Sequence, residues 1–146
     1  EPIEAVISSM QGGGLNLKKM HAGGLCGMAT KLDPSITTAD NLSGQVVAKK
    51  GDLPEVRSRI EISVNLMNNM VAGEGEKPEK IQPLRNNEML MLNVATATSV
   101  GVTKNAEKTR TGLELRLPIC ADVGQRVSLS RRVGSRWRLI GYGTIQ

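Results

Sequence analysis

Apolar and polar side chains alternate along residues 56–67, which is the pattern of a half-buried β-strand. Successive side chains of a strand point to opposite faces, so one face of this segment is expected to enter a core. The apolar residues that share one parity are Val56, Ile60, Ile62, Val64 and Leu66. The residues of the other parity are polar: Arg57, Arg59, Glu61, Ser63 and Asn65. Helical periodicity is scarce in the rest of the chain, so strands are expected to dominate the fold.

Further segments carry strand signals at nearly regular spacing. Apolar and charged residues alternate from Leu113 to Ile119, and "MLMLNVA" from Met89 is a continuous apolar run. Shorter candidates are residues 3–7, 44–48 and 127–133, with glycine-containing turns between the segments. Many short strands separated by turns predict an antiparallel sandwich or barrel, and the fold class is therefore predicted to be all-β.

The core of such a fold has to be aliphatic. The 146 residues include one Trp, one Tyr and no Phe, so burial must come from Leu, Ile, Val and seven Met. With 39% hydrophobic and 23% charged residues, the composition is that of a folded globular protein. No apolar run approaches the roughly 20 residues of a membrane span, and no signal peptide opens the chain. A cytoplasmic protein without a membrane partner is therefore expected.

The segment "AKKGDLPEV", from Ala48, interrupts the strand pattern and is predicted to be a domain boundary. Residues 55–146 suffice for a compact barrel of roughly six or seven strands. Residues 1–54 are too few for an independent core, so they either pack on that barrel or belong to a domain whose other half is missing. The chain begins Glu1-Pro2 without an initiator Met, as a processed protein or a piece of a longer one would. Residues 71–80, with mixed charge, are expected to form a loop.

Positive charge is concentrated near the end of the chain. The formal net charge is +5 and the pI is near 9.5, which favours an acidic partner such as nucleic acid. Residues 126–138 contain no acidic residue and hold five of the nineteen Lys and Arg residues, which are Arg126, Arg131, Arg132, Arg136 and Arg138.

A two-residue turn at Gly134-Ser135 is predicted to fold this basic segment into a hairpin. The expected cross-strand pairs are Val133 with Arg136, Arg132 with Trp137, Arg131 with Arg138, Leu129 with Ile140, and Val127 with Tyr142. Like charges directly opposite each other favour an anion between them, and Arg132 is expected to stack over Trp137. Two interpretations stay open. The arginines bind nucleic-acid phosphate, or they are solvated or paired with Asp and Glu from elsewhere.

No catalytic or metal centre is predicted. The chain has no P-loop motif, and "GGLCG" from Gly23 lacks the Lys and the context of a phosphate-binding loop. His21 is the only histidine, which excludes a histidine-based metal cluster, and Cys26 and Cys120 lie outside any C-x-x-C spacing. Turns explain the acidic residues considered for acid and base roles, which are Asp33, Asp40 and Asp122. The chain is therefore not expected to be an enzyme or to bind a cofactor of its own.

Three segments resemble one protein family. The most specific, "LPICADVGQRVSLSRRVGSRWRLIGYGTI" from Leu117 to Ile145, closely resembles the C-terminal end of the gamma subunit of archaeal and eukaryotic translation initiation factor 2. "GGLCGMATKLDPSITTADNLSGQVV" from Gly23 looks like that family's second domain, and "RNNEMLMLNVATATSVGV" from Arg85 is a third match. The three matches stand in the family's order, and the archaeal members are the nearer likeness.

The resemblance implies that residues 1–54 are the C-terminal part of an incomplete second-domain β-barrel and that residues 55–146 are the third-domain barrel. The family's first domain, which binds GTP and magnesium, is missing from this chain. The resemblance further implies a part of the factor that delivers methionyl initiator tRNA to the small ribosomal subunit in a GTP-dependent way. The expected partners are that tRNA, small-subunit RNA, the alpha subunit of the same factor, and the beta subunit only through the missing domain.

The resemblance also implies sites. The candidates for contact with the aminoacyl end of the tRNA are Gly23, Gly24, Leu25, Cys26 and Gly27, for which a tight glycine turn is an equal explanation. The candidates for contact with the alpha subunit are Gln11, Gly12, Gly13 and Gly14. Those for contact with RNA or the missing domain are Arg131, Arg132, Arg136, Trp137 and Arg138. Two alternatives remain, a purely structural docking module without RNA contact and part of the related selenocysteine-specific elongation factor.

Overall fold

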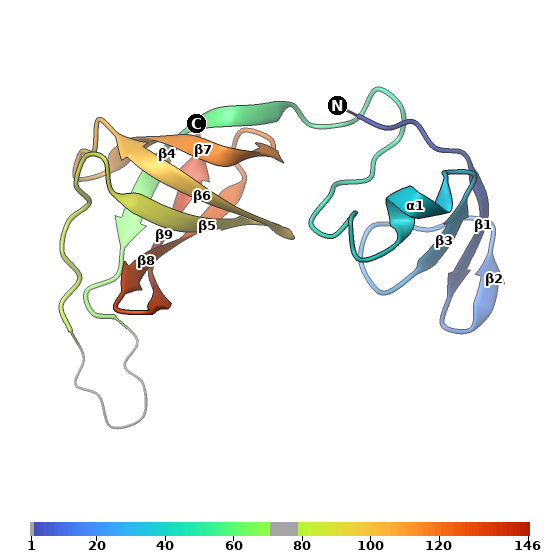
Figure 1. The fold of residues 1–146 in the computed structure, drawn as a ribbon, viewed down its shortest axis with the longest axis horizontal. Coiled ribbons are helices and arrows are strands. Elements are labelled where there is room, and N and C mark those ends of the chain that lie inside the picture. The colour runs from blue at the N-terminus through green and yellow to red at the C-terminus, as the bar shows by residue number, and fades with distance from the viewer. Residues whose placement is uncertain (1, 71–78) are drawn as a thin grey trace. The chain divides into compact units, whose positions relative to one another are not determined.

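The computed structural model describes residues 2–70 and 79–146, so the loop expected at residues 71–80 lies mostly outside the described chain. The chain divides into two compact units, Glu1–Leu42 and Ser43–Gln146, each with a sheet of its own (Figure 1). This division falls before the boundary predicted at residue 54, because residues 43–54 associate with the second unit. The position at which two family-type domains meet stays a prediction.

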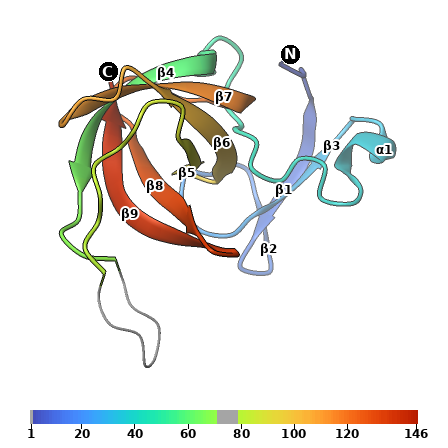
Figure 2. The ribbon, with the colours of Figure 1, turned by 60° about the vertical axis from the view of Figure 1, so that its left-hand side comes forward.

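The second unit contains an antiparallel barrel. Its strands follow the closed order β4-β7-β6-β5-β8-β9, and Figure 2 shows them curving round one interior. This architecture confirms the all-β prediction. The strand bounds are β4 Val56–Leu66, β5 Met89–Val94, β6 Ala97–Lys104, β7 Arg110–Cys120, β8 Arg126–Val133 and β9 Arg136–Ile145.

Aliphatic side chains fill the barrel, as the alternation along residues 56–67 predicts. Ile60, Ile62 and Val64 of β4 are buried in one cluster with Leu, Ile and Val side chains of the other strands. Each such side chain contributes about 1.5 to 3 kcal/mol by leaving water. Val56 is an exception, since it is 52% exposed. The prediction was wrong there because the register between β4 and β7 shifts between Arg57 and Arg59.

The pairing of β8 with β9 agrees with the predicted hairpin at its tip and departs from it at its base. A register shift between Leu129 and Ser130 leaves Ile140 as an extra residue on β9, as in a β-bulge. Leu129 therefore pairs with Gly141, and the predicted pairing with Ile140 was wrong. Val127 likewise pairs with Gly143 instead of Tyr142. The pairs nearer the turn are confirmed, namely Arg131 with Arg138, Arg132 with Trp137 and Val133 with Arg136.

The same bulge places Tyr142 on the outer face of the barrel. It was predicted to pair with Val127, which is buried, but it pairs with Ser128 and is 44% exposed. Because one extra residue reverses the alternation of every later side chain, Ile140 can stay buried while Tyr142 turns outward.

Two glycines of β9 allow that strand to pass close to β4 and close the barrel. A Cβ atom at Gly143 would lie 2.6 Å from the carbonyl oxygen of Ser63, and one at Gly141 would lie 2.9 Å from the Cα atom of Leu66. These neighbours are backbone atoms that cannot rotate away. Glycine is therefore required at both positions for the β4–β9 pairing.

The first unit contains a small antiparallel sheet in the order β2-β1-β3. Its strands are β1 Ile7–Gly12, β2 Leu15–Leu17 and β3 Gly27–Thr30. None of the described residues in Glu1–Leu42 is fully buried. This exposure fits the expectation that so short a segment cannot build an independent core.

A single helical turn, α1, follows at Pro34–Thr37. The Asp33 side chain caps it by accepting a hydrogen bond from the Ser35 backbone N–H at 2.8 Å, and this bond lowers the pKa of the Asp33 carboxyl group. The strands predicted at residues 3–7 and 44–48 were wrong, because β1 begins only at Ile7 and residues 44–48 join no sheet. A short alternating segment needs a pairing partner before it becomes a strand.

Candidate nucleic-acid interface

The basic hairpin consists of β8, β9 and the turn at Gly134-Ser135. Gly134 has a φ of +60°, which the first position of the predicted turn requires and glycine adopts without strain. Residues that are paired, or that alternate along a strand, share a face. The pairing therefore places Arg131, Arg136 and Arg138 on one face of the tip and Arg132 with Trp137 on the other.

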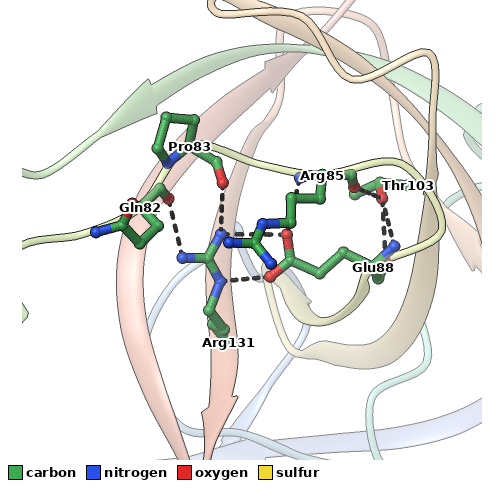
Figure 3. Close-up of polar contacts among 6 residues, drawn as sticks. All are labelled: Gln82, Pro83, Arg85, Glu88, Thr103 and Arg131. Carbon is green, nitrogen blue, oxygen red and sulfur yellow. Dashed lines mark hydrogen bonds and ion pairs between the residues drawn. The ribbon is translucent and has the colours of Figure 1, made fainter.

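Arg131 is held by groups of its own chain (Figure 3). Its Nε donates to one carboxylate oxygen of Glu88, and its Nη2 donates to the other at 3.1 Å. Nη1 donates to the carbonyl of Gln82 at 2.9 Å, and Nη2 also donates to that of Pro83 at 3.2 Å. Only 17% of each of the Arg131 and Glu88 side chains is exposed. This group of four residues, called here the Arg131 clasp, is a structural element of the barrel.

The clasp fixes residues 82–88 against the barrel wall. Glu88 accepts a further hydrogen bond from the Arg85 backbone N–H at 3.1 Å. The buried Thr103 hydroxyl of β6 accepts from the Glu88 backbone N–H at 2.9 Å and donates toward the Arg85 carbonyl. Figure 3 shows these contacts converging on Glu88 from both sides. No local sequence pattern indicates the contact of Arg131 with Glu88, because only barrel closure brings the two residues together.

The remaining arginines of the tip differ from Arg131. Arg136 is exposed, and its side chain makes no ion pair or hydrogen bond within residues 2–70 and 79–146. Arg132 is also exposed, and its Nε reaches only the neighbouring Gly134 carbonyl at 3.4 Å. Trp137 and Arg138 are half-buried beside them. The structure therefore separates one structural arginine from two that extend into solvent.

The stacking of an arginine on an aromatic ring occurs at a different place from the one predicted. The guanidinium carbon of Arg126 lies 5.2 Å from the centroid of the Tyr142 ring, at the base of the hairpin. The predicted contact was between Arg132 and Trp137 at the tip. The bulge after Leu129 explains the difference, because it turns Tyr142 to the outer face on which Arg126 lies.

Two arginines on the β4–β7 side of the barrel are paired with glutamates. Arg59 Nη2 lies 3.2 Å from Glu114 Oε1 across the two strands. Arg110 forms an ion pair with Glu61 that raises the pKa of the arginine. The charge of these two arginines is therefore compensated, whereas that of Arg132 and Arg136 is not.

The two glycine-rich segments predicted to contact different partners lie next to each other. Gln11 pairs with Gly27 across β1 and β3, and a Cβ atom at Gly12 would lie 3.7 Å from the Leu25 carbonyl oxygen. Gly13 and Gly14 form the tight β1–β2 turn with φ values of +59° and +79°.

The segment of Gly23, Gly24, Leu25, Cys26 and Gly27 leads into β3 as an exposed bend. Gly23 and Gly24 have φ values of +106° and +79°, and the Leu25 side chain is 96% exposed. The bend itself explains the glycines, whereas a fully exposed leucine has no packing role in its own unit.

Within the described chain, no three His, Cys, Asp or Glu side chains lie close enough together to hold a metal ion. The Cys120 thiol donates to the Pro54 carbonyl at 3.0 Å, and burial raises the pKa of that thiol. In the same residues, no helix is long and apolar enough to cross a membrane.

Comparison with known proteins gives a consistent result. Residues 58–145 match the family model described as "Initiation factor eIF2 gamma, C terminal". The protein named translation initiation factor 2 subunit gamma in Methanocaldococcus jannaschii is 50% identical over 147 residues, and that in Methanococcus aeolicus is 49% identical over 146. The same subunit of Thermococcus onnurineus is 46% identical over 146 residues.

The matches cover 100% of this chain but only 35% of each of these relatives. The family match spans the barrel strands from β4 to β9 and includes the whole basic hairpin. The chain belongs to the family of the initiation factor eIF2 gamma C-terminal region, and its relatives of known name are archaeal gamma subunits.

Proposed function

We propose that this chain is part of a translation initiation factor that delivers methionyl initiator tRNA to the small ribosomal subunit in a GTP-dependent way. The printed names of its relatives support a role in translation initiation. Binding of GTP and magnesium, and contact with a beta subunit, belong in this proposal to parts of the factor outside this chain. The chain itself contributes contact with RNA and a rigid scaffold.

The observation that carries the RNA contact is the uncompensated charge at the tip of the β8–β9 hairpin. Arg132 and Arg136 are exposed, and no acidic side chain of the described residues neutralises them. A guanidinium group presents paired N–H donors that match the oxygens of a phosphate, and its charge is retained at every physiological pH. Phosphate contacts of this kind position a protein on RNA without reading its sequence.

Arg131 and Trp137 support the tip in this proposal and do not contact RNA themselves. The donors of Arg131 are directed to Glu88, Gln82 and Pro83, which fixes the strand that carries Arg132. Arg138 lies on the same face as Arg136. This division of roles also supports the structural alternative in part, since one of the hairpin arginines is used for packing.

A second contact is proposed for the first unit. The turn at Gln11 to Gly14 is the candidate for the alpha subunit, and Gly23 to Gly27 is the candidate for the aminoacyl end of the tRNA. The pairing of Gln11 with Gly27 and the exposure of Leu25 favour one continuous contact surface. A Leu25→Glu variant is expected to weaken binding of methionylated tRNA, measured as less protection of its ester bond from hydrolysis than the unchanged chain gives.

The test of the RNA contact is fluorescence anisotropy with labelled methionyl initiator tRNA and with a small-subunit RNA helix. Binding is measured with the chain between about 50 and 200 mM salt, where several phosphate contacts cost about a thousandfold in affinity. The Arg132→Ala/Arg136→Ala variant is expected to flatten that dependence. Absence of RNA binding, or identical curves for both proteins, would favour a docking module in which these arginines do not contact RNA.

A further inference from the structure

A second group of donors lies beside the Arg131 clasp. Gln82, Arg85, Asn86, Glu88 and Arg131 line one surface pocket on the barrel. The loop residues of this pocket are far in sequence from the hairpin, and the clasp brings them to the face that Arg131 shares with Arg136 and Arg138. The pocket therefore shares Arg131 with the hairpin face on which Arg136 and Arg138 lie.

The acceptors around the pocket are already used. Both carboxylate oxygens of Glu88 accept from Arg131, and one of them also accepts from the Arg85 backbone N–H. The carbonyls of Gln82 and Pro83 accept from the remaining sides of the same guanidinium. The single negative charge of the pocket is thus neutralised by one arginine, and the charge of the second arginine remains.

The donors of the pocket are not all used. The Arg85 side chain is exposed and forms no ion pair or hydrogen bond within the described parts of the chain, and Figure 3 shows it turned toward the Arg131–Glu88 pair. The Asn86 Oδ1 atom accepts from the Ala106 backbone N–H at 2.6 Å. This bond fixes the amide so that its NH₂ group is left to donate. A pocket whose acceptors already accept hydrogen bonds, and whose donors are free, is suited to bind an anion.

We propose that this pocket binds a backbone phosphate of RNA through the Arg85 guanidinium and the Asn86 amide, with the Arg131–Glu88 ion pair as its floor. The inference rests on the proposed RNA contact and adds to it a defined phosphate subsite. A backbone phosphate is the anion expected here because the inference rests on RNA contact and a guanidinium fork matches phosphate oxygens. Arg131 is a positioning residue here, since it fixes residues 82–88 by its contacts with Glu88.

The first experiment uses inorganic phosphate as the probe. The 146-residue chain is titrated at constant ionic strength, and NMR follows the Arg85 Nε–H signal and the backbone amide of Ala106, which reports on Asn86. Both signals are expected to move together to saturation. The shift of the Ala106 amide is expected to disappear in Arg85→Ala, and both shifts are expected to persist in the control Arg116→Ala, which removes another exposed arginine, on β7.

The second experiment measures methionyl initiator tRNA with the same two variants. Arg85→Ala is expected to lower the slope of log affinity against log salt by about 1, and Arg116→Ala is expected to leave it unchanged. Equal slopes for the two variants, or tighter binding of a tetraglutamate peptide than of phosphate, would overturn the phosphate subsite. Absence of any salt-dependent RNA binding by the unchanged chain would instead overturn the proposed function, whatever the phosphate titration gives.

Discussion

Two sides of the same barrel use arginine in different ways. On β4 and β7, Arg59 and Arg110 face Glu114 and Glu61 on the neighbouring strand, and each pair lies largely in solvent. At the tip of the β8–β9 hairpin, Arg132 and Arg136 have no acidic partner in the described residues. The net positive charge of this chain is therefore concentrated in one hairpin.

Arg131 lies between these two cases. It belongs to the hairpin by sequence, yet its guanidinium is mostly buried and forms an ion pair with Glu88. An arginine that is enclosed in this way stabilises the fold, whereas one that extends into water is available to a ligand. The following changes test whether the three groups of arginines differ as the geometry indicates.

The largest effect on stability is expected for Arg131→Ala. The substitution leaves the carboxylate of Glu88 without a counter-ion and two backbone carbonyls without donors, so the free energy of unfolding should fall by about 3 kcal/mol. Urea denaturation checks this expectation, with Arg136→Ala as the control of equal charge change. A loss no larger than that of the control would show that the clasp contributes no stability.

A smaller loss is expected for Glu88→Gln, which keeps one acceptor and removes the negative charge. The free energy of unfolding should fall by about 1 to 2 kcal/mol, because charged hydrogen bonds become neutral ones. Hydrogen exchange at the Arg85 amide, which donates to Glu88, should become faster at the same time. Unchanged exchange would mean that Glu88 does not hold residues 82–88.

A still smaller effect is expected for the exposed pair of Arg110 and Glu61. A double-mutant cycle with alanine at both positions should give only a weak coupling in dilute buffer, because both side chains lie largely in solvent. Because salt screens exposed charges, the coupling should vanish near about 1 M NaCl. A coupling that persists at high salt would show that this pair stabilises the fold in the same way as the Arg131–Glu88 pair.

The smallest effect on stability is expected for Arg132→Ala combined with Arg136→Ala. Neither side chain has an acidic partner to lose, so the free energy of unfolding should stay within about 0.5 kcal/mol of the unchanged chain. Thermal unfolding of both proteins measures the difference. A loss comparable to that of Arg131→Ala would reassign these arginines to the scaffold.

The part of the fold that sequence predicts best is the barrel. Alternation along residues 56–67 identifies β4 and its buried face, since periodicity alone determines which side chains enter the core. The turn at Gly134-Ser135 likewise fixes the hairpin as far as Arg131 and Arg138. The bulge at Ile140 could not be predicted, because an extra residue on one strand has no signature in the local pattern.

The candidate site was predictable only in part. The tip arginines follow from the sequence as a run of positive charge without acids. The contact of Arg131 with Glu88 depends on the antiparallel pairing of β5 with β8, in which Leu90 lies opposite Arg131. The positions of Arg85 and Asn86 beside the hairpin also depend on barrel closure. No rule of sequence spacing predicts them.

Position on the barrel, and not charge alone, is proposed to determine which arginines contact RNA. The measurement that tests this proposal most directly compares two double variants of equal charge, Arg132→Ala/Arg136→Ala and Arg59→Ala/Arg110→Ala. The slope of log affinity for methionyl initiator tRNA against log salt is determined for each by fluorescence anisotropy. The hairpin variant is expected to lose about 2 units of slope, and the β4–β7 variant is expected to keep the slope of the unchanged chain. Equal slopes for the two variants would contradict the proposal.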